Sequence, residues 1–222
     1  MATRRVLSEL GAMYEKQSGQ HVAIEFAGGV DGARRVEAGE SFDFVVLAAL
    51  AIDRLATSGR IDPDTRTAIA HSRVAIAVPA GAQRPDLGSE QAVRDAMLAA
   101  RRIGYSTGPS GEHLLRLLQR WGIAHVVTPR MVKAPSGVPV GTLVASGKVD
   151  LGVQQLSELM NHPGIDVAGP LPAEIQENTV FTGAVCVSSA RRASARALLA
   201  FCASSQADAT KRNLGMEPCQ PD

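Results

Sequence analysis

Three loop-to-helix junctions, at residues 27–34, 106–113 and 133–141, carry residue types that suit a small anion. Each places glycine, serine or proline at the predicted start of a helix. N–H groups at a helix N-terminus favour bound anions, and glycine lets the backbone approach a ligand closely. We therefore expect a carboxylate or another oxyanion as ligand. The candidate contacts, mostly through backbone N–H groups, are Gly29, Val30, Ala49, Ser106, Ser110, Gly111, Val140 and Gln155.

Two adjacent amides extend this set. Gln154 and Gln155 follow a predicted strand at residues 151–153. Open α/β sheets place ligand contacts outside the carboxyl ends of their strands, and side-chain amides can donate to carboxylates. Lys133 could neutralise an anionic ligand, although a solvated lysine is the more common case.

Ordinary structural roles remain open for the same residues. Asp31 and Ser110 are each suited to cap a helix with nothing bound, and Gln155 can stand at an ordinary helix start. His113 lies beside Leu114 in a helical pattern, so a packing or surface role is favoured over catalysis.

Catalytic and metal-binding signatures are absent. The chain has no G-x-S-x-G elbow, no H-E-x-x-H and no metal-spaced cluster, so we expect no cofactor or metal, and the catalytic residues, if any, are unknown. Three cysteines without C-x-x-C spacing argue against a zinc site or a disulfide framework. Cys186 and Cys202 lie in apolar segments and are predicted to pack in the core, whereas Cys219 lies in a proline-flanked tail and could be exposed.

Composition excludes several classes of partner. The 222 residues carry a net charge of +1, with no basic block longer than two arginines, so we expect no nucleic-acid partner. No apolar run approaches the roughly 20 residues of a membrane helix. The first residues lead into an amphipathic helix and show no secretory signal.

The elements that must position these loops alternate between helix and strand, which indicates an α/β fold. A unit of helix end, glycine, aspartate and apolar strand occurs twice, at 36–46 and 144–153, and suggests two similar lobes with a ligand cleft between them. We expect lobe one at 1–79 with 172–222 and lobe two at 80–171, joined by crossings near 78–82 and 166–172. The predicted helices are 4–17, 31–38, 50–58, 89–100, 110–121, 139–146, 154–160 and 190–203, and the predicted strands are 22–26, 43–48, 72–79, 102–105, 126–127, 131–132, 151–153 and 180–187.

Five stretches, taken in order, resemble the type II periplasmic solute-binding proteins, in particular the molybdate-binding-protein-like branch. They are residues 26–29 with 34–39, then 43–48, 78–81, 143–147 and 167–174. The resemblance implies a two-lobed fold with mixed, mainly parallel sheets flanked by helices, a small anionic ligand bound between the lobes by hinge closure, and an ABC transporter membrane complex as partner.

At two positions this chain departs from the family pattern, and these departures change the ligand that we expect. Gly29 stands where the family has a molybdate-contacting serine, and Gln155 stands near the position of its late tyrosine. The loss of these hydroxyls favours an organic carboxylate over molybdate. A narrower similarity of residues 105–111 and 154–159 to the aconitate isomerase proteins implies an alternative, a cofactor-independent isomerase of an unsaturated tricarboxylate, with polar groups at Tyr105, Glu112 and Lys133.

The resemblance also places a strand and a ligand loop before the helix at 4–17, so we expect the natural start of the lobe to lie upstream of Met1. Loss of that strand would expose strand edges, an association hazard. Localisation stays open on this basis. We expect a periplasmic protein if a signal segment precedes these residues, and a cytoplasmic one otherwise.

Overall fold

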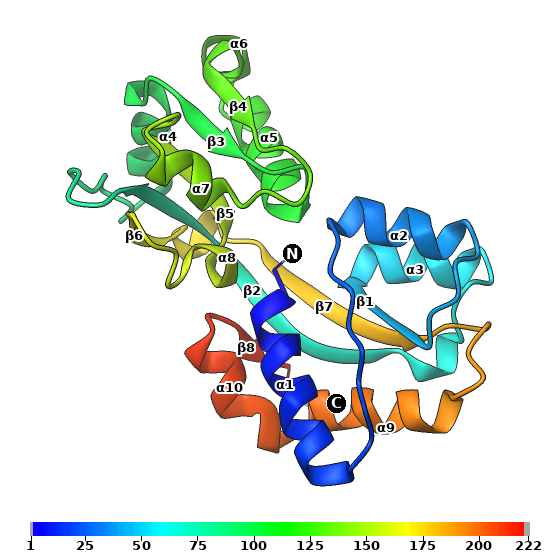
Figure 1. Cartoon of the computed structure of the whole chain (residues 1–222). Coiled ribbons are helices and arrows are strands. Elements are labelled where there is room, and N and C mark those ends of the chain that lie inside the picture. Colours follow the sequence, from blue (N-terminus) through cyan, green and yellow to red (C-terminus); the bar gives the residue numbers. More distant parts are fainter. Residues whose placement is uncertain (1, 220–222) are drawn as a thin grey trace. The chain divides into compact units, whose positions relative to one another are not determined.

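The computed structural model describes residues 2–219 and divides the chain into two compact units. Unit 1 is residues 1–72 with 179–222, and unit 2 is residues 73–178, so unit 2 is inserted into unit 1 (Figure 1). The predicted boundary residues Pro79 and Pro172 both fall inside unit 2. The reason is that β2 (Thr67–Pro79) continues as a strand of the unit 2 sheet, and Leu171 N–H donates to the Val74 carbonyl at 3.0 Å.

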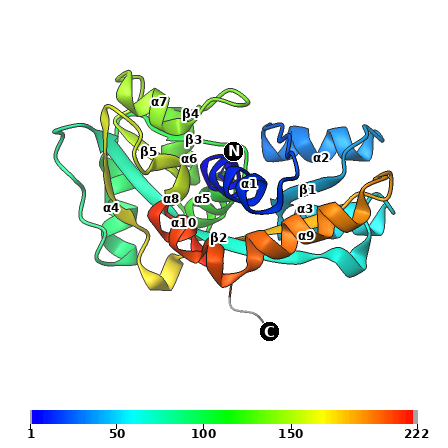
Figure 2. The ribbon, with the colours of Figure 1, turned by 60° about the horizontal axis from the view of Figure 1, so that its bottom comes forward.

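Unit 1 has helices on both faces of its sheet. One apolar cluster joins α1 and α9 to β2 and β7, and another joins α2 and α3 to β1. Figures 1 and 2 both show α9 running alongside β2 and β7. The other elements of unit 1 are α1 (Arg4–Ser18), α2 (Gly29–Glu37), β1 (Phe44–Ala48), α3 (Ala49–Thr57), the 3-10 turn η1 (Pro63–Thr65), β7 (Asn178–Val185), α9 (Arg192–Ala203), η4 (Ser205–Ala207), α10 (Asp208–Asn213) and β8 (Glu217–Pro218).

The unit 1 strands pair mainly in antiparallel fashion. Strand β1 pairs with β7 in the register Phe44 to Val185, β7 neighbours β2, and β8 pairs with β2 at Ala70 and His71. Helices stop where the sequence predicts, at left-handed glycines such as Gly19 (φ 70°) and Gly59 (φ 68°).

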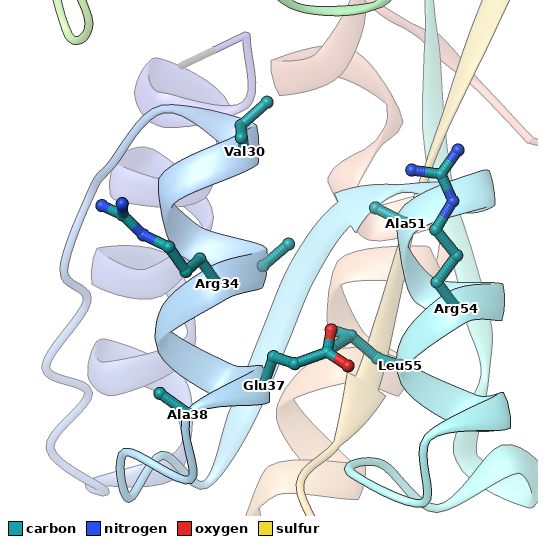
Figure 3. A pocket seen from close by; sticks show the side chains of 8 residues that line it. Val30, Arg34, Glu37, Ala38, Ala51, Arg54 and Leu55 are labelled. Atoms are coloured by element: carbon teal, nitrogen blue, oxygen red, sulfur yellow. The ribbon is translucent and has the colours of Figure 1, made fainter.

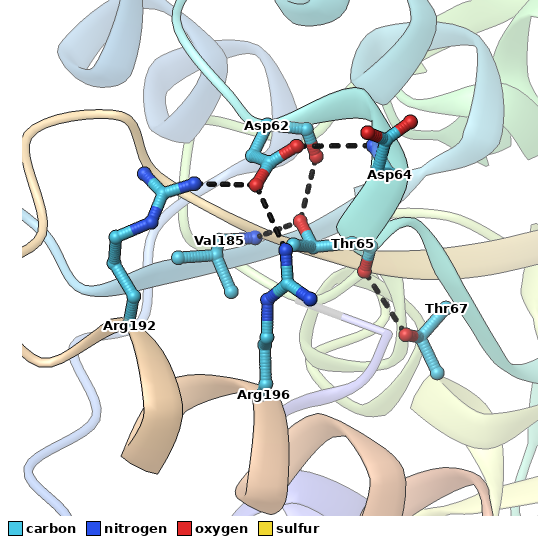
Figure 4. A network of polar contacts seen from close by, with 7 residues as sticks. All are labelled: Asp62, Asp64, Thr65, Thr67, Val185, Arg192 and Arg196. Carbon is cyan, nitrogen blue, oxygen red and sulfur yellow. Dashed lines mark hydrogen bonds and ion pairs between the residues drawn. The ribbon is translucent and has the colours of Figure 1, made fainter.

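A polar network holds η1 against β7 and α9 (Figure 4). The Asp62 carboxylate accepts from the Asp64 N–H at 3.1 Å and pairs with both Arg192 and Arg196. The Thr65 hydroxyl donates to the Asp62 carbonyl at 2.6 Å and accepts the Val185 N–H at 2.9 Å. One short turn is therefore tied to two other elements of unit 1.

Unit 2 contains a mixed sheet. Strand β3 is parallel to both β4 and β5, while β2 is antiparallel to β5 and β6. Apolar side chains from β2, α4, α5 and α6 pack into one cluster. The elements of unit 2, besides β2, are α4 (Glu90–Ala99), β3 (Ile103–Tyr105), α5 (Pro109–Arg120), α6 (Ala124–Val127), η2 (Thr128–Arg130), β4 (Met131–Lys133), α7 (Val140–Ala145), β5 (Leu151–Gln155), α8 (Leu156–Leu159), β6 (Ile165–Pro170) and η3 (Ala173–Ile175).

The α/β fold is therefore mixed, with more antiparallel pairing than the helix–strand alternation indicates. Alternation predicts parallel pairing only for strands that a helical crossover joins. Strands β2 and β7 instead lie on the segments that link the two units. Strand β7 is antiparallel to β1, and β2 is antiparallel to β5.

Three local predictions were wrong. Residues 22–26 form no strand, although Val22, Ile24 and Phe26 pack partly buried against unit 1. Residues 126–127 belong to helix α6, because apolar pairs this short carry no period that separates strand from helix. The return crossing predicted near 166–172 lies inside unit 2, because residues 165–170 form strand β6 of that unit. Within residues 2–219, no helix combines the length and apolar character needed to cross a membrane.

Candidate anion-binding site

The carboxyl ends of three unit 2 strands lie at one edge of the sheet. Tyr105 at the end of β3 is in register with Lys133 at the end of β4 and with Val153 in β5, so Gln155 ends β5 at the same edge. The chain turns from these strands into helices α5, α7 and α8. Backbone N–H groups at helix starts and the polar residues that follow the strands are thereby gathered in unit 2, as expected for a ligand-binding edge.

The start of α5 is tightly built. Ser110 is 1% exposed, and its hydroxyl lies 3.4 Å from that of Ser106. A Cβ atom at Gly111 would lie 1.7 Å from the Ser106 carbonyl oxygen, so only glycine fits. The N-cap is Gly108, not Ser110, so the capping role considered for this serine does not apply. The Gly111 N–H donates to the Gly108 carbonyl at 2.9 Å, which leaves Gly111 a steric role instead of a free donor.

The start of α7 is joined to the end of β5. The Val140 N–H donates to Gln154 Oε1 at 2.8 Å, and both residues are buried. The Val140 N–H, predicted as a ligand contact, is therefore engaged within the protein. Gln154, predicted either to donate to a ligand or to stand at an ordinary helix start, supplies an acceptor that orients the start of α7 next to Gln155.

A carboxyl group that the sequence does not single out lies close by. Glu158, on the short helix α8, is partly buried. Burial raises the pKa of Glu158, and a hydrogen bond with Gln154 acts in the opposite direction. A carboxyl with a raised pKa beside a candidate binding edge is a candidate for proton transfer. The sequence signal for it is its place within residues 154–159, the stretch similar to the aconitate isomerase proteins.

The remaining polar candidates of unit 2 have simpler surroundings. Lys133 and Glu112 are exposed, and Tyr105 is half-buried. His113 is buried, with Nε2 2.7 Å from the Ile175 carbonyl and Nδ1 2.9 Å from the Glu177 carboxylate. Both ring nitrogens are held by the segment that follows β6, so the packing role predicted for His113 is confirmed.

Unit 1 contains two of the helix starts that the sequence predicts as ligand contacts. Helix α2 begins at Gly29 with Gly28 as N-cap, and α3 begins at Ala49 directly after β1. Asp31 is not the cap; it lies in the first turn of α2 and pairs with Arg34 at 3.0 Å. Nothing lies within 4 Å of a Cβ atom built at Gly29, so this backbone is open on that side. Val30 is 63% exposed.

Between α2 and α3 lies an open groove of about 490 Å³ (Figure 3). Its walls carry three charged side chains on an otherwise apolar surface. Figure 3 shows Glu37 pointing from α2 into the space between the helices, while Arg34 points away from it. The lining residues are Val30, Ala33, Arg34, Glu37, Ala38, Ala51, Arg54 and Leu55.

The cysteines are placed as predicted for core residues. Cys186 and Cys202 are buried, and burial raises the pKa of the Cys186 thiol to about 11. Cys219 is half-buried. No group of three or more histidine, cysteine or acidic side chains within residues 2–219 could hold a metal ion.

Comparison with models of protein families shows to which family this chain belongs. The model of the bacterial extracellular solute-binding proteins matches residues 1–217. The chain belongs to this family. An aconitate isomerase from a Pseudomonas species is 33% identical over 220 residues, which cover 96% of this chain and 83% of that protein.

Solved structures of periplasmic binding proteins confirm the predicted fold. The periplasmic molybdate-binding protein of Azotobacter vinelandii matches with a TM-score of 0.82 and 22% identity over 99% of this chain and 96% of that one. The sulfate-binding protein of Mycobacterium tuberculosis matches with a TM-score of 0.76 and 18% identity over 99% of this chain and 83% of that one. At these identities the likeness establishes the fold and leaves the ligand to be argued from the residues.

Proposed function

We propose that this solute-binding protein binds a small organic carboxylate. The observation that carries the proposal is the start of α5, where two hydroxyls and a sterically required glycine adjoin the carboxyl edge of β3. The Ser106 and Ser110 hydroxyls can donate to a carboxylate, and the N-terminal end of the α5 dipole stabilises a negative charge. The helix starts at Gly29 and Ala49 are the proposed contacts in unit 1.

A carboxylate is favoured over a tetrahedral oxyanion by the polar groups present. Gly29 and Gln155 supply no hydroxyl, whereas the Gln155 amide can donate to a planar carboxylate. The relative of 33% identity is an aconitate isomerase, whose substrate is a tricarboxylate. Membership in an extracellular solute-binding family further supports a function outside the cytoplasm, with delivery of the ligand to an ABC-type membrane complex.

Calorimetric titration tests the proposal. Citrate, cis-aconitate and trans-aconitate are each titrated into the protein, alongside molybdate and sulfate. We expect heat from at least one carboxylate, and a loss of about tenfold or more in affinity for Ser110→Ala, because each charge-assisted hydrogen bond contributes about 1.5–3 kcal/mol. Ser146→Ala, at the C-terminal end of α7, is the matched control and should bind normally. Tight molybdate binding without a carboxylate response would overturn the proposal.

The same relative favours a second candidate function, isomerisation of an unsaturated tricarboxylate. A base would remove a proton from the CH₂ carbon next to the double bond, the double bond would shift toward that carbon, and a proton would be returned to the former vinyl carbon, with no net change in atoms or electrons. Glu158 is the proposed proton-transfer group, because burial raises its pKa and it lies beside the proposed contact Gln155.

Proton NMR in D₂O separates the two functions. An isomerase interconverts cis- and trans-aconitate without added cofactor and incorporates deuterium, and Glu158→Gln should abolish both effects while carboxylate binding persists. Glu174→Gln, which removes a carboxylate of unit 2 from the turn η3, should leave turnover unchanged. Binding without turnover or deuterium uptake at high protein concentration would leave the binding function alone.

A further inference from the structure

Both nitrogens of the buried His113 ring face groups that can only accept a hydrogen bond. Nε2 lies 2.7 Å from the Ile175 carbonyl oxygen, and Nδ1 lies 2.9 Å from the Glu177 carboxylate. A neutral imidazole has one N–H and one lone pair, so it can donate to only one of these two oxygens. The doubly protonated imidazolium donates to both.

A protonated Glu177 would be the other way to satisfy the ring, and Arg116 opposes it. The Arg116 guanidinium pairs with the same carboxylate oxygen, Oε2, that His113 contacts. A cation at this distance favours the ionised form of a carboxyl group. Loss of one ring proton would therefore leave a buried nitrogen lone pair facing an oxygen, which is unfavourable.

These contacts join α5 to an anchored segment of unit 2. Within that segment, the Gln176 side-chain oxygen accepts the Val74 N–H at 2.8 Å. The Gln176 amide nitrogen donates to the Val74 carbonyl at 3.1 Å and to the Leu171 carbonyl at 3.0 Å. Residues 175–177 are thus fixed to the backbone of β2, and they hold α5 through His113.

The ring lies one helical turn from a proposed ligand contact. Ser110 and His113 are both buried in α5, and residues three apart are neighbours on a helix surface. Of the other acids nearby in sequence, Glu112 is exposed, and Glu174 accepts the Glu90 N–H at 2.6 Å. Among the described residues, Glu177 and Arg116 are therefore the charged groups recorded at this ring.

On the basis of the function proposed above, we propose that His113 is a positioning residue that makes ligand binding at the start of α5 sensitive to pH. The doubly protonated ring holds α5 on residues 175–177. When one proton is lost, one of the two contacts is lost with it, and the start of α5 is less well ordered for the ligand. Histidine is the side chain that exchanges a proton between about pH 5 and 8, so carboxylate affinity should fall as the pH rises through this range.

Calorimetry at about pH 5.5 and about pH 8 tests this proposal, with citrate, cis-aconitate or trans-aconitate, whichever binds. The ratio of wild-type affinity to His113→Gln affinity cancels the ionisation of the ligand itself. This ratio should fall about fivefold as the pH rises, the effect of one hydrogen bond. An unchanged ratio overturns the proposal.

Two further variants make the result specific. Glu177→Gln should bind with the pH profile of His113→Gln, because a side-chain amide can accept from a protonated ring nitrogen or donate to a neutral one. His125→Gln makes the same change at an exposed histidine of α6 and should keep the wild-type profile. Circular dichroism establishes that the variants are folded. If His113→Gln is not, Glu177→Gln, at a half-buried position, replaces it in the ratio.

NMR of the ligand-free protein separates this proposal from the proposed function. The backbone amide shifts of Ser110 and Gly111 should follow the titration of the His113 ring. They should follow it much less in Glu177→Gln, where the ring still titrates but its contact survives. Coupled shifts without any carboxylate binding would reject the proposed function and support the role of His113. Shifts that do not follow the ring, or that are as large in Glu177→Gln, would overturn that role even if a carboxylate binds.

Discussion

The Val140 N–H donates to the side-chain oxygen of Gln154 at 2.8 Å, although fourteen residues separate the two in the chain. The start of α7 is thereby fixed to the last residues of β5, where Gln155 is proposed to contact the ligand. A buried side chain, and not a ligand, satisfies this helix start. The position of the binding edge in unit 2 thus depends on Gln154.

Replacement of Gln154 by Met should destabilise the protein and weaken ligand binding together. The Val140 N–H would lose its acceptor inside the protein, which costs about 1–3 kcal/mol in the free energy of unfolding. Urea denaturation measures the stability, and calorimetry with the carboxylate measures the affinity. Gln119→Met, on the exposed face of α5, is the control and should change neither quantity.

Replacement by alanine should change stability differently at two glycines that are predicted ligand contacts. Gly111→Ala forces a Cβ atom to within 1.7 Å of the Ser106 carbonyl oxygen, and the resulting shift should cost about 1–3 kcal/mol of stability. Gly29→Ala meets no atom within 4 Å and should fold as well as the wild type. If the ligand approaches the Gly29 backbone, Gly29→Ala should nevertheless bind the carboxylate more weakly. Thermal denaturation and calorimetry on both variants distinguish these effects, and equal stability of the two would contradict the prediction.

The hydroxyl of Thr65 should matter more than that of a surface threonine. Thr65→Val leaves the buried Val185 N–H without its acceptor, so the free energy of unfolding should fall by about 1–3 kcal/mol. Thr57→Val removes a hydroxyl that bonds the Asp53 carbonyl at the exposed end of α3 and should change stability by about 0.5 kcal/mol or less. Guanidinium denaturation at neutral pH compares the two. A smaller loss for Thr65→Val than for Thr57→Val would show that the network in Figure 4 is dispensable.

Acid should remove a stabilising contribution from Glu90. Hydrogen bonds from the Trp121 indole and from Arg120 lower the pKa of this carboxyl below its ordinary value of 4.5. Because the folded pKa is the lower one, the contribution is complete above pH 4.5 and is lost as the pH falls from there through the folded pKa. The stability difference between wild type and Glu90→Gln, measured by urea denaturation, should therefore shrink between neutral pH and strong acid. Glu9→Gln, which removes an exposed carboxylate from α1, is the control for the loss of one surface charge.

Lys211 should be replaceable by an apolar side chain. It is fully buried, its Nζ atom lies 3.5 Å from Asp208 Oδ1, and that nitrogen has no hydrogen-bond partner among the described residues. Burial of an ammonium group is costly, and its replacement by a well-packed apolar side chain is often neutral or stabilising by about 1–4 kcal/mol. Lys211→Met should therefore match or exceed the thermal stability of the wild type, while Asp208 keeps Arg212 as a partner at 3.8 Å. A clear loss of stability would show that the ion pair outweighs its desolvation.

Most elements of the fold could be predicted from sequence, because their signals are local. Helix α1 ends at Gly19 and α3 ends just before Gly59, where glycine permits the left-handed conformation, and β1 and β5 are short apolar runs next to those signals. Residues 22–26 alternate in burial as a strand would, yet a strand also needs a neighbour with which to exchange hydrogen bonds. Whether a neighbouring strand is available cannot be predicted from residues 22–26 alone.

The candidate site was predictable only in its outline. The serines and glycines before α5 indicate a helix start, and the structure has one there. Which N–H groups remain available for a ligand depends on contacts with residues distant in sequence, as Gln154 and Val140 illustrate. The surroundings of Glu158, which raise its pKa, likewise arise only from tertiary packing.

The place of β7 in the unit 1 sheet has a consequence for synthesis of the protein. Strand β7 lies between β1 and β2 in the sheet but follows both in the chain, after the whole of unit 2. On the ribosome, β1 and the first half of β2 are made long before the strand that separates them. Unit 2 can therefore complete its own sheet first, whereas the apolar residues of unit 1 stay exposed until residues 178–185 have been synthesised. Aggregation of the nascent chain is the greatest hazard during this interval.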